Sequence, residues 1–217
     1  MGELSRVKIV QQIVSEGAVA IIRVMDPDKV MHIASALKQG GLSCIEISMS
    51  TPGTLKLLEQ ISLKMEHEIL LGVGSVLDAE TARLAILAGA RYIVSPVVNP
   101  EIIQLAHRYD IPAIPGAFTP TEILHAQELG ADLVKVFPAD ILGIPFIQAI
   151  RAPMPHLQLM PTGGITVDNA GEWIKAGASV VGIGSALVDK KMVENAQYHL
   201  LTQRAELLRE NITEARR

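Results

Sequence analysis

The protein is a chain of 217 residues with a formal net charge of −4; 49% of its residues are hydrophobic and only 3% are aromatic. This length fits one domain near the lower limit for an eight-fold α/β barrel, and the hydrophobic share allows a sizeable aliphatic core. The charge balance and the lack of a long basic block argue against nucleic acid as a partner.

The sequence also bears on redox chemistry and location. Cys44 is the only cysteine, which excludes an intrachain disulfide and a metal site made of several cysteines. It lies in an apolar run, so we expect a small buried residue. The charged start, Met1–Val7, is unlike a signal peptide, and no apolar run is long enough to span a bilayer. We expect a cytoplasmic protein with no membrane partner.

In chain order, short β-branched runs alternate with amphipathic stretches at intervals of roughly 20–28 residues, which is typical of repeated βα units. An extra helix is expected first, at about Glu3–Glu16, and a charged helix last, at about Lys190–Ala215. The expected strands are Val19–Val24, Cys44–Met49, Ile69–Val73, Tyr92–Ser95, Ala113–Ile114, Leu133–Phe137, Gln158–Met160 and Val180–Ile183.

Two helices between these strands have ends that can be predicted from the sequence. The segment Thr119-Pro120-Thr121-Glu122 is a capping box with proline at the first helical position. Asp78 is expected to cap the helix Ala79–Ala88, and Gly89 to end it.

Eight such units predict a single-domain (β/α)8 TIM barrel with an extra N-terminal helix, made of residues 1–217. An open, doubly wound sheet is the main alternative. Its dinucleotide-binding form needs G-x-G-x-x-G after a strand, and both Gly72-Val73-Gly74 and Gly182-Ile183-Gly184 lack the third glycine. The barrel is therefore favoured.

Three ionisable residues interrupt otherwise aliphatic strands: Arg23, Glu46 and Lys135. Side chains at the carboxyl ends of barrel strands meet at the active site. Lys135 is either a structural lysine, whose amine reaches solvent or pairs with a carboxylate, or a nucleophile, since burial and a nearby cation such as Arg23 both favour the neutral amine. Glu46 either forms a structural ion pair or transfers protons. Their joint presence favours catalysis.

Two glycine-bearing turns follow the last two strands, at 161–165 and 182–187. Glycine lets backbone N–H groups approach an anion, and a following helix N-terminus favours negative charge. These turns predict a phosphorylated ligand, although tight turns alone would also explain the glycines. The histidines map to expected helices or loops, which argues against a metal centre: His32, His67, His107, His125, His156 and His199.

Several motifs together resemble those of the class I 2-dehydro-3-deoxy-phosphogluconate (KDPG) and 4-hydroxy-2-oxoglutarate (KHG) aldolases, a family with a related galactonate-type branch. The resemblance runs from about Val19 to Val188. It is carried by Ile45-Glu46-Ile47, Gly72–Leu77, Val94-Ser95-Pro96, Pro115-Gly116, Val134–Ala139 and Pro161–Ile165.

The resemblance implies a homotrimeric enzyme that needs no metal and no cofactor. It implies that Lys135 forms an imine with a 2-keto acid and that Glu46 is the general acid–base. Ser75, Pro96, Phe137 and Thr162 would line the pyruvate site. The phosphate would be held around Gly163, Gly164, Gly184 and Ser185.

This chain departs from some members at Ser50, where they carry an arginine. Other members have a small polar residue there and an arginine on the first strand, which matches Arg23. Both Arg23 and Ser50 are thus candidates for contacting the substrate. The turn after the last strand is also one residue shorter than in some relatives.

The expected reaction is reversible cleavage of 2-dehydro-3-deoxy-6-phosphogluconate to pyruvate and the phosphorylated aldehyde glyceraldehyde 3-phosphate. Cleavage of 4-hydroxy-2-oxoglutarate to pyruvate and glyoxylate is the nearest alternative. A phosphate-binding barrel isomerase or synthase and a non-catalytic binder of phosphorylated ligands are two others.

Overall fold

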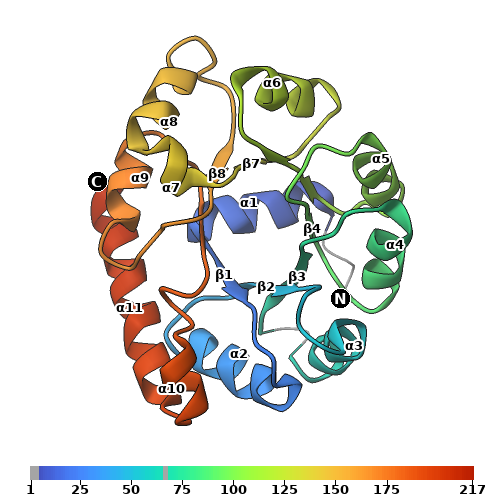
Figure 1. The fold of residues 1–217 in the computed structure, drawn as a ribbon, viewed down its shortest axis with the longest axis vertical. Helices are drawn as coiled ribbons and strands as arrows, with labels where there is room; N and C mark the ends of the chain where they lie inside the picture. Colours follow the sequence, from blue (N-terminus) through green and yellow to red (C-terminus); the bar gives the residue numbers. More distant parts are fainter. Residues whose placement is uncertain (1–4, 66–67) are drawn as a thin grey trace.

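The computed structural model describes residues 5–65 and 68–217. The first two residues of the expected N-terminal helix and His67 lie outside these ranges. The described chain forms an α/β fold in which parallel strands lie at the centre and most helices lie around them (Figure 1). No helix within these ranges is long and apolar enough to cross a membrane.

All strand pairs are parallel, and strands that follow one another in the chain are mostly neighbours in space. One sheet has the order β5-β4-β3-β2-β1-β9 and the other the order β6-β7-β8. The strands are β1 Ala18–Ile22, β2 Cys44–Ser48, β3 Leu70–Gly74, β4 Ile93–Val94, β5 Ala113–Ile114, β6 Gly116–Ala117, β7 Val134–Val136, β8 Leu159–Pro161 and β9 Val181–Ile183.

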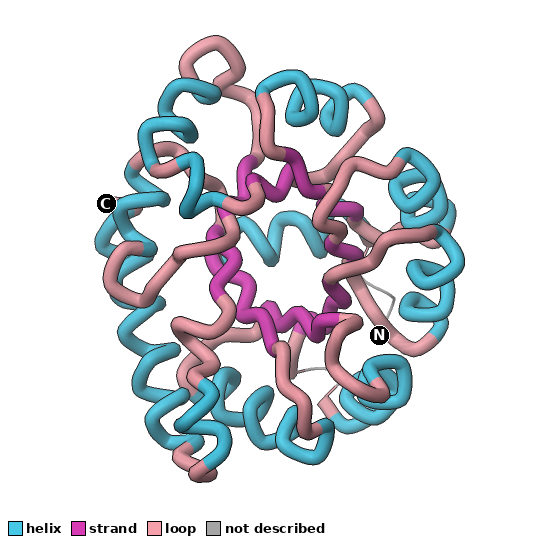
Figure 2. Tube along the Cα trace, viewed as in Figure 1, coloured by secondary structure: helices cyan, strands magenta, loops and turns pink. Residues whose placement is uncertain are grey.

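Helices follow most strands and cover the outside of the curled sheet, as the cyan and magenta tubes show in Figure 2. The first strand is followed by a short 3-10 helix, Pro27–Lys29, which leads into α2. The helices are α1 Arg6–Glu16, α2 Val30–Gln39, α3 Thr54–Lys64, α4 Ala79–Leu87, α5 Pro100–Arg108, α6 Pro120–Glu128, α7 Ala139–Leu142, α8 Ile144–Arg151, α9 Ala170–Lys175, α10 Lys190–Glu194 and α11 Tyr198–Ala215.

The eight strands and the two capped helices predicted from the sequence are all present in the structure. Thr119 and Glu122 form the capping box at α6, and the Asp78 side chain accepts a hydrogen bond from Thr81 N at 2.6 Å at the start of α4. Gly89 follows α4 with a positive φ of 104°, which a β-carbon would make costly. Cys44 is fully buried, as expected.

Two expectations about element boundaries were wrong. The expected fifth strand continues as β6 after Pro115, which lacks an N–H and interrupts the ladder. The expected C-terminal helix is two helices, α10 and α11. The chain turns between them at Ala196, whose φ of 54° is left-handed and incompatible with a continuous helix.

The core has two parts because alternate residues of each strand face opposite ways. The larger part lies between strands and outer helices and includes Ile45 and Ile47. The smaller part lies inside the curved sheet and contains Cys44 and Tyr92, together with Ile9 and Ile13 of α1. Side chains on the inner face therefore include those of Cys44 and Glu46, which alternate with the two isoleucines.

Candidate active site

A cavity of about 600 Å³ opens at the carboxyl ends of the strands. Its wall includes Glu46 and Lys135, the loop after β1 and the turns after β8 and β9. Nine of the twelve residues expected at the site line it: Arg23, Glu46, Lys135, Phe137, Thr162, Gly163, Gly164, Gly184 and Ser185. The remaining three, Ser50, Ser75 and Pro96, are not part of its wall.

Lys135 lies in the middle of β7, between two valines that pack in the outer core. Its side chain is only 6% exposed, and its Nζ lies 4.7 Å from the centre of the Phe137 ring. Burial lowers the pKa of Lys135, Glu46 opposes that shift, and the positive charge of Arg23 adds to it. An amine that loses its proton more readily is a better nucleophile toward a carbonyl carbon.

Glu46 occupies the middle of β2 and is 1% exposed. Its Oε2 has no hydrogen-bond partner among the described residues. Burial raises the pKa of Glu46, while Lys135 and then Arg23 lower it. Within the described chain neither Glu46 nor Lys135 forms an ion pair of 4.0 Å or less, so the structural ion-pair interpretation finds no support. A carboxyl group whose pKa is raised toward neutrality is suited to proton transfer.

A chain of hydroxyl groups connects Arg23 to the end of β2. The Arg23 Nη2 donates to Ser75 Oγ at 3.5 Å, Ser75 Oγ lies 3.0 Å from Ser48 Oγ, and Ser48 Oγ lies 2.8 Å from Ser50 Oγ. Ser75 adopts a left-handed φ of 62°, which is unusual for a residue other than glycine. Ser75 therefore contacts Arg23 directly, and Ser50 is linked to it through Ser48 and Ser75, although neither Ser50 nor Ser75 is part of the cavity wall.

Sequence reasoning missed Ser48, although the signal was available. Ser48 follows Glu46 by two residues on the same strand, so both side chains face inward. Pro96, expected at the pyruvate site, packs its backbone against Gly116: a β-carbon at Gly116 would lie 2.4 Å from the Pro96 carbonyl.

The two glycine turns present backbone donors to the cavity. The N–H groups of Gly163, Gly164, Ile165, Ser185 and Ala186 donate to no acceptor among the described residues. Gly163 and Gly164 have φ values of 102° and 69°, so these positions require glycine. Clusters of unbonded N–H groups bind anions well.

The expected helix N-termini do not follow these turns directly. Helix α9 begins only at Ala170, and the start of α10 is capped by the Asp189 side chain, which accepts from Met192 N at 3.1 Å. After β9 the chain makes a single turn in which Leu187 N and Val188 N both donate to Gly184 O. Free N–H groups of the turns, rather than a helix N-terminus, are therefore the donors that this wall offers to an anion.

Two lysines at the cavity wall were not anticipated. Lys29 ends the short 3-10 helix after β1, and its Nζ lies 3.9 Å from Asp26 Oδ2. Lys190 begins α10, and its Nζ lies 3.7 Å from Glu194 Oε1. Neither lysine was predicted from the sequence, because both lie at helix ends and not within strands, where a charge is unexpected. The available signal was the position of each lysine shortly after the end of a strand, Lys29 after the first and Lys190 after the last.

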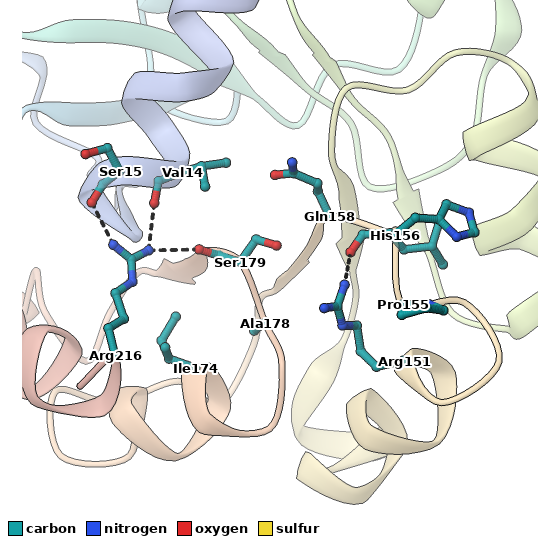
Figure 3. A pocket seen from close by; sticks show the side chains of 11 residues that line it. Val14, Ser15, Arg151, Pro155, His156, Gln158, Ile174, Ala178, Ser179 and Arg216 are labelled. Carbon is teal, nitrogen blue, oxygen red and sulfur yellow. Dashed lines mark hydrogen bonds between the residues drawn. The ribbon is translucent and has the colours of Figure 1, made fainter.

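A second cavity, of about 590 Å³, lies near the amino ends of β8 and β9 (Figure 3). Its two arginines hold backbone segments together. Arg216 donates to the carbonyls of Val14, Ser15 and Ser179 at 2.6–3.1 Å, and Arg151 donates to Leu157 O at 2.6 Å. None of the expected site residues lines it.

Comparison with known proteins agrees with this geometry. Residues 9–204 match the family described as KDPG and KHG aldolase. A probable 2-dehydro-3-deoxy-6-phosphogalactonate aldolase of Rhizobium meliloti is 37% identical over 171 residues, which cover 78% of this chain and 80% of the relative. A 2-dehydro-3-deoxy-phosphogluconate aldolase of Haemophilus influenzae is 31% identical over 87% of this chain and 89% of its own.

The solved structures include a KDPG aldolase from Legionella pneumophila, described with pyruvate captured as a covalent carbinolamine intermediate. It superposes with a TM-score of 0.86 and 27% identity, over 94% of this chain and 98% of that chain. The match to the family model covers far more than half of the sequence, and the relatives cover most of it. The chain belongs to the KDPG and KHG aldolase family.

Proposed function

We propose that the protein is a class I aldolase in which Lys135 forms an imine with a 2-keto acid and Glu46 transfers protons. One observation carries the proposal: a buried lysine and a buried carboxyl group line the same cavity as two turns with unbonded N–H groups. Burial shifts their pKa values in opposite directions, lowering that of Lys135 and raising that of Glu46, so the neutral amine becomes easier to form and the carboxyl group becomes better suited to exchange protons.

The reaction begins at the substrate's C2 carbonyl. The neutral Lys135 amine adds to C2 to form a carbinolamine, which loses water to leave a protonated imine. The Phe137 ring, 4.7 Å from Nζ, favours the positive charge of this imine through its π face.

Cleavage follows with Glu46 as the base. The carboxylate takes the proton of the C4 hydroxyl, C4 becomes the aldehyde carbon, and the electrons of the C3–C4 bond form an enamine with the imine as electron sink. The protonated Glu46 then returns the proton to C3. Hydrolysis of the resulting imine releases pyruvate and regenerates the Lys135 amine, so one carboxyl group acts first as base and then as acid.

The substrate class follows from the anion-binding turns. Free N–H groups at 163–165 and 185–186 suit a phosphate. This favours 2-dehydro-3-deoxy-6-phosphogluconate over 4-hydroxy-2-oxoglutarate, which has no phosphate. The second candidate substrate is 2-dehydro-3-deoxy-6-phosphogalactonate, because the Rhizobium meliloti relative, which is 37% identical, is named for this compound.

Borohydride reduction in the presence of pyruvate tests the mechanism. The reduced adduct is expected on Lys135, located by mass spectrometry of peptides, and Lys135→Ala is expected to give none. Lack of an adduct on the unmodified protein would discard the imine mechanism. Comparing kcat/KM for the gluconate and galactonate epimers and for 4-hydroxy-2-oxoglutarate then assigns the substrate.

The proposal includes a single closed barrel made of residues 1–217. Three contacts between the two sheets support it: Asp132 N donates to Ala113 O at 3.1 Å, Lys135 N donates to Pro115 O at 2.9 Å, and Thr162 pairs with Gly182 in a parallel bridge. With β5 and β6 counted as one interrupted strand, the strands number eight.

A homotrimer is proposed for the assembled enzyme, as in the family it resembles. Exposed leucines on and beside neighbouring helices α3 and α4 supply apolar surface that an oligomer would bury: Leu63, Leu77, Leu84 and Leu87. Light scattering tests this, with three chain masses expected. A cytoplasmic location is also proposed, because the phosphorylated substrate would be retained inside the cell.

A further inference from the structure

Two buried polar atoms lie without partners inside the curved sheet. Among the described residues, the buried side-chain atoms that lack a hydrogen bond are Glu46 Oε2, Tyr92 Oη and Trp173 Nε1. Glu46 and Tyr92 are 1% and 0% exposed. A buried carboxyl oxygen or hydroxyl without a partner is costly, so each unpaired atom requires an explanation.

The glycines of β3 place these two groups near each other. A β-carbon at Gly72 would lie 2.2 Å from the Tyr92 ring carbon that bears the hydroxyl, and a β-carbon at Gly74 would lie 2.3 Å from the Glu46 carboxyl carbon. Residues two apart on a strand face the same side at a spacing of about 6.6 Å. The two groups that bear the orphan oxygens therefore lie against successive inward-facing positions of β3, on the same face of the sheet.

The spacing of about 6.6 Å between these strand positions is one that a single water molecule can bridge. Two hydrogen bonds of about 2.8 Å and two carbon–oxygen bonds together span about 7 Å when they bend at the water. Both groups complement it, since a phenol donates and a carboxylate only accepts. A buried water needs at least two polar partners, and these two atoms supply them.

We propose that a buried water joins Tyr92 Oη to Glu46 Oε2 and makes Tyr92 a positioning residue for the proton-transferring carboxyl. The phenol donates to the water, and the water donates to Oε2. This fixes one carboxylate oxygen from within the barrel and leaves the other to face the substrate. The inference rests on the proposed aldolase function, because it concerns the same Glu46.

The charged and titratable groups around the pair are few. Lys135 on β7 and Arg23 after β1 act on Glu46 from the cavity side. Tyr92 faces Cys44 and Glu46 on β2 and Glu16 of α1, and its own buried hydroxyl has a pKa well above the usual value, mainly because of desolvation. Tyr92 therefore stays protonated and acts only as a hydrogen-bond donor.

Tyr92→Phe tests the proposal because phenylalanine fills the same space. Loss of the donor destabilises the carboxylate form of Glu46, so its pKa rises. The acidic limb of the pH profile of kcat/KM is expected to move upward by about 0.5–1 pH unit, the size expected for one ordinary hydrogen bond. Tyr109→Phe is the matched control: it removes a hydroxyl that contacts Arg83 at the surface, and no shift is expected.

An unmoved acidic limb together with a raised melting temperature would overturn the proposal, since it would show that the hydroxyl is an unsatisfied group and nothing more. A crystal structure of the unmodified protein provides a second test that does not depend on the variant folding. Density for a water bound to both Tyr92 Oη and Glu46 Oε2 is expected, and ordered side chains with no such water would contradict it.

Borohydride trapping with pyruvate separates this inference from the proposed function. If the unmodified protein forms the adduct but Tyr92→Phe leaves the pH profile unchanged, only the role of Tyr92 fails. If the unmodified protein forms no adduct, the aldolase mechanism fails, while the crystal structure still decides whether the water is present.

Discussion

The carboxyl group of Glu46 lies directly against the α-carbon of Gly74 on the neighbouring strand. A β-carbon at position 74 would be 1.6 Å from Oε1 and 2.3 Å from the carboxyl carbon of Glu46. Gly74 pairs with Ser48 in the ladder, so the site's carboxyl extends along the inner face of β3. Glycine is required at position 74 because of this contact and not because of backbone conformation, since the φ of Gly74 is not in the left-handed region.

Gly74→Ala is therefore expected to displace the Glu46 carboxyl while keeping the backbone intact. A displacement of about 1 Å from productive geometry lowers kcat by about 100-fold. Pyruvate trapping on Lys135 should persist, because the substitution does not touch the lysine. Steady-state kinetics and borohydride trapping measure the two effects, and circular dichroism controls for folding; an unchanged kcat would contradict the expected contact.

The pH dependence of activity should reflect both buried groups. In the proposed mechanism Glu46 acts as the carboxylate and Lys135 as the neutral amine, so kcat/KM should rise as pH rises through each pKa. The acidic limb should lie above pH 4.5, because burial raises the pKa of Glu46, and the plateau should be reached below pH 10.5, because burial lowers the pKa of Lys135. Glu46→Gln should remove the first limb and most of kcat; a limb that persists in this variant would belong to another group.

Ser185→Glu tests the anion-binding turns. Ser185 is exposed at the cavity wall, so a glutamate there should leave folding unchanged and repel a phosphate. We expect KM for the phosphorylated substrate to rise by about 10-fold or more, which corresponds to a change of about 1.4 kcal/mol. Trapping of pyruvate, which has no phosphate, should be unaffected; equal losses with both ligands would argue against a phosphate site here.

Arg23 and Ser50 can be distinguished as substrate contacts. Arg23 lines the cavity, whereas Ser50 reaches it only through Ser48 and Ser75. Arg23→Ala should raise KM by about 10- to 100-fold, as expected for loss of a hydrogen bond from a charged group. Ser50→Ala should have a much smaller effect, and the reverse order in titrations of the substrate would show that Ser50 makes the contact.

Arg216→Ala should affect stability and leave catalysis unchanged. Its guanidinium satisfies three backbone carbonyls, two of them at the end of α1. Leaving these acceptors without their donor should lower the free energy of unfolding by about 1–3 kcal/mol, measured in urea, with kcat unchanged. Arg217→Ala is the control, since its side chain makes no hydrogen bond or ion pair with the described residues. A loss of kcat in Arg216→Ala would mean that this arginine acts on the site.

The sequence alone determined the eight strands, the caps at Asp78 and Thr119, and the charged residues Glu46 and Lys135 within strands; Arg23, expected within the first strand, directly follows β1. These features depend on local patterns: β-branched runs, hydrogen-bonding caps and the alternation of inward and outward side chains. It also placed Lys135 and Glu46 in one site, because strands of a parallel sheet end on the same side.

Only the tertiary structure decided which groups touch. The Gly74–Glu46 contact and the Arg23–Ser75–Ser48 chain depend on the register between strands that are far apart in sequence. The break at Ala196 was also decided by the tertiary structure, because alanine carries no local preference for a left-handed turn. Periodicity tells which way a side chain faces, but the distance between two side chains is set by the packing of the whole chain.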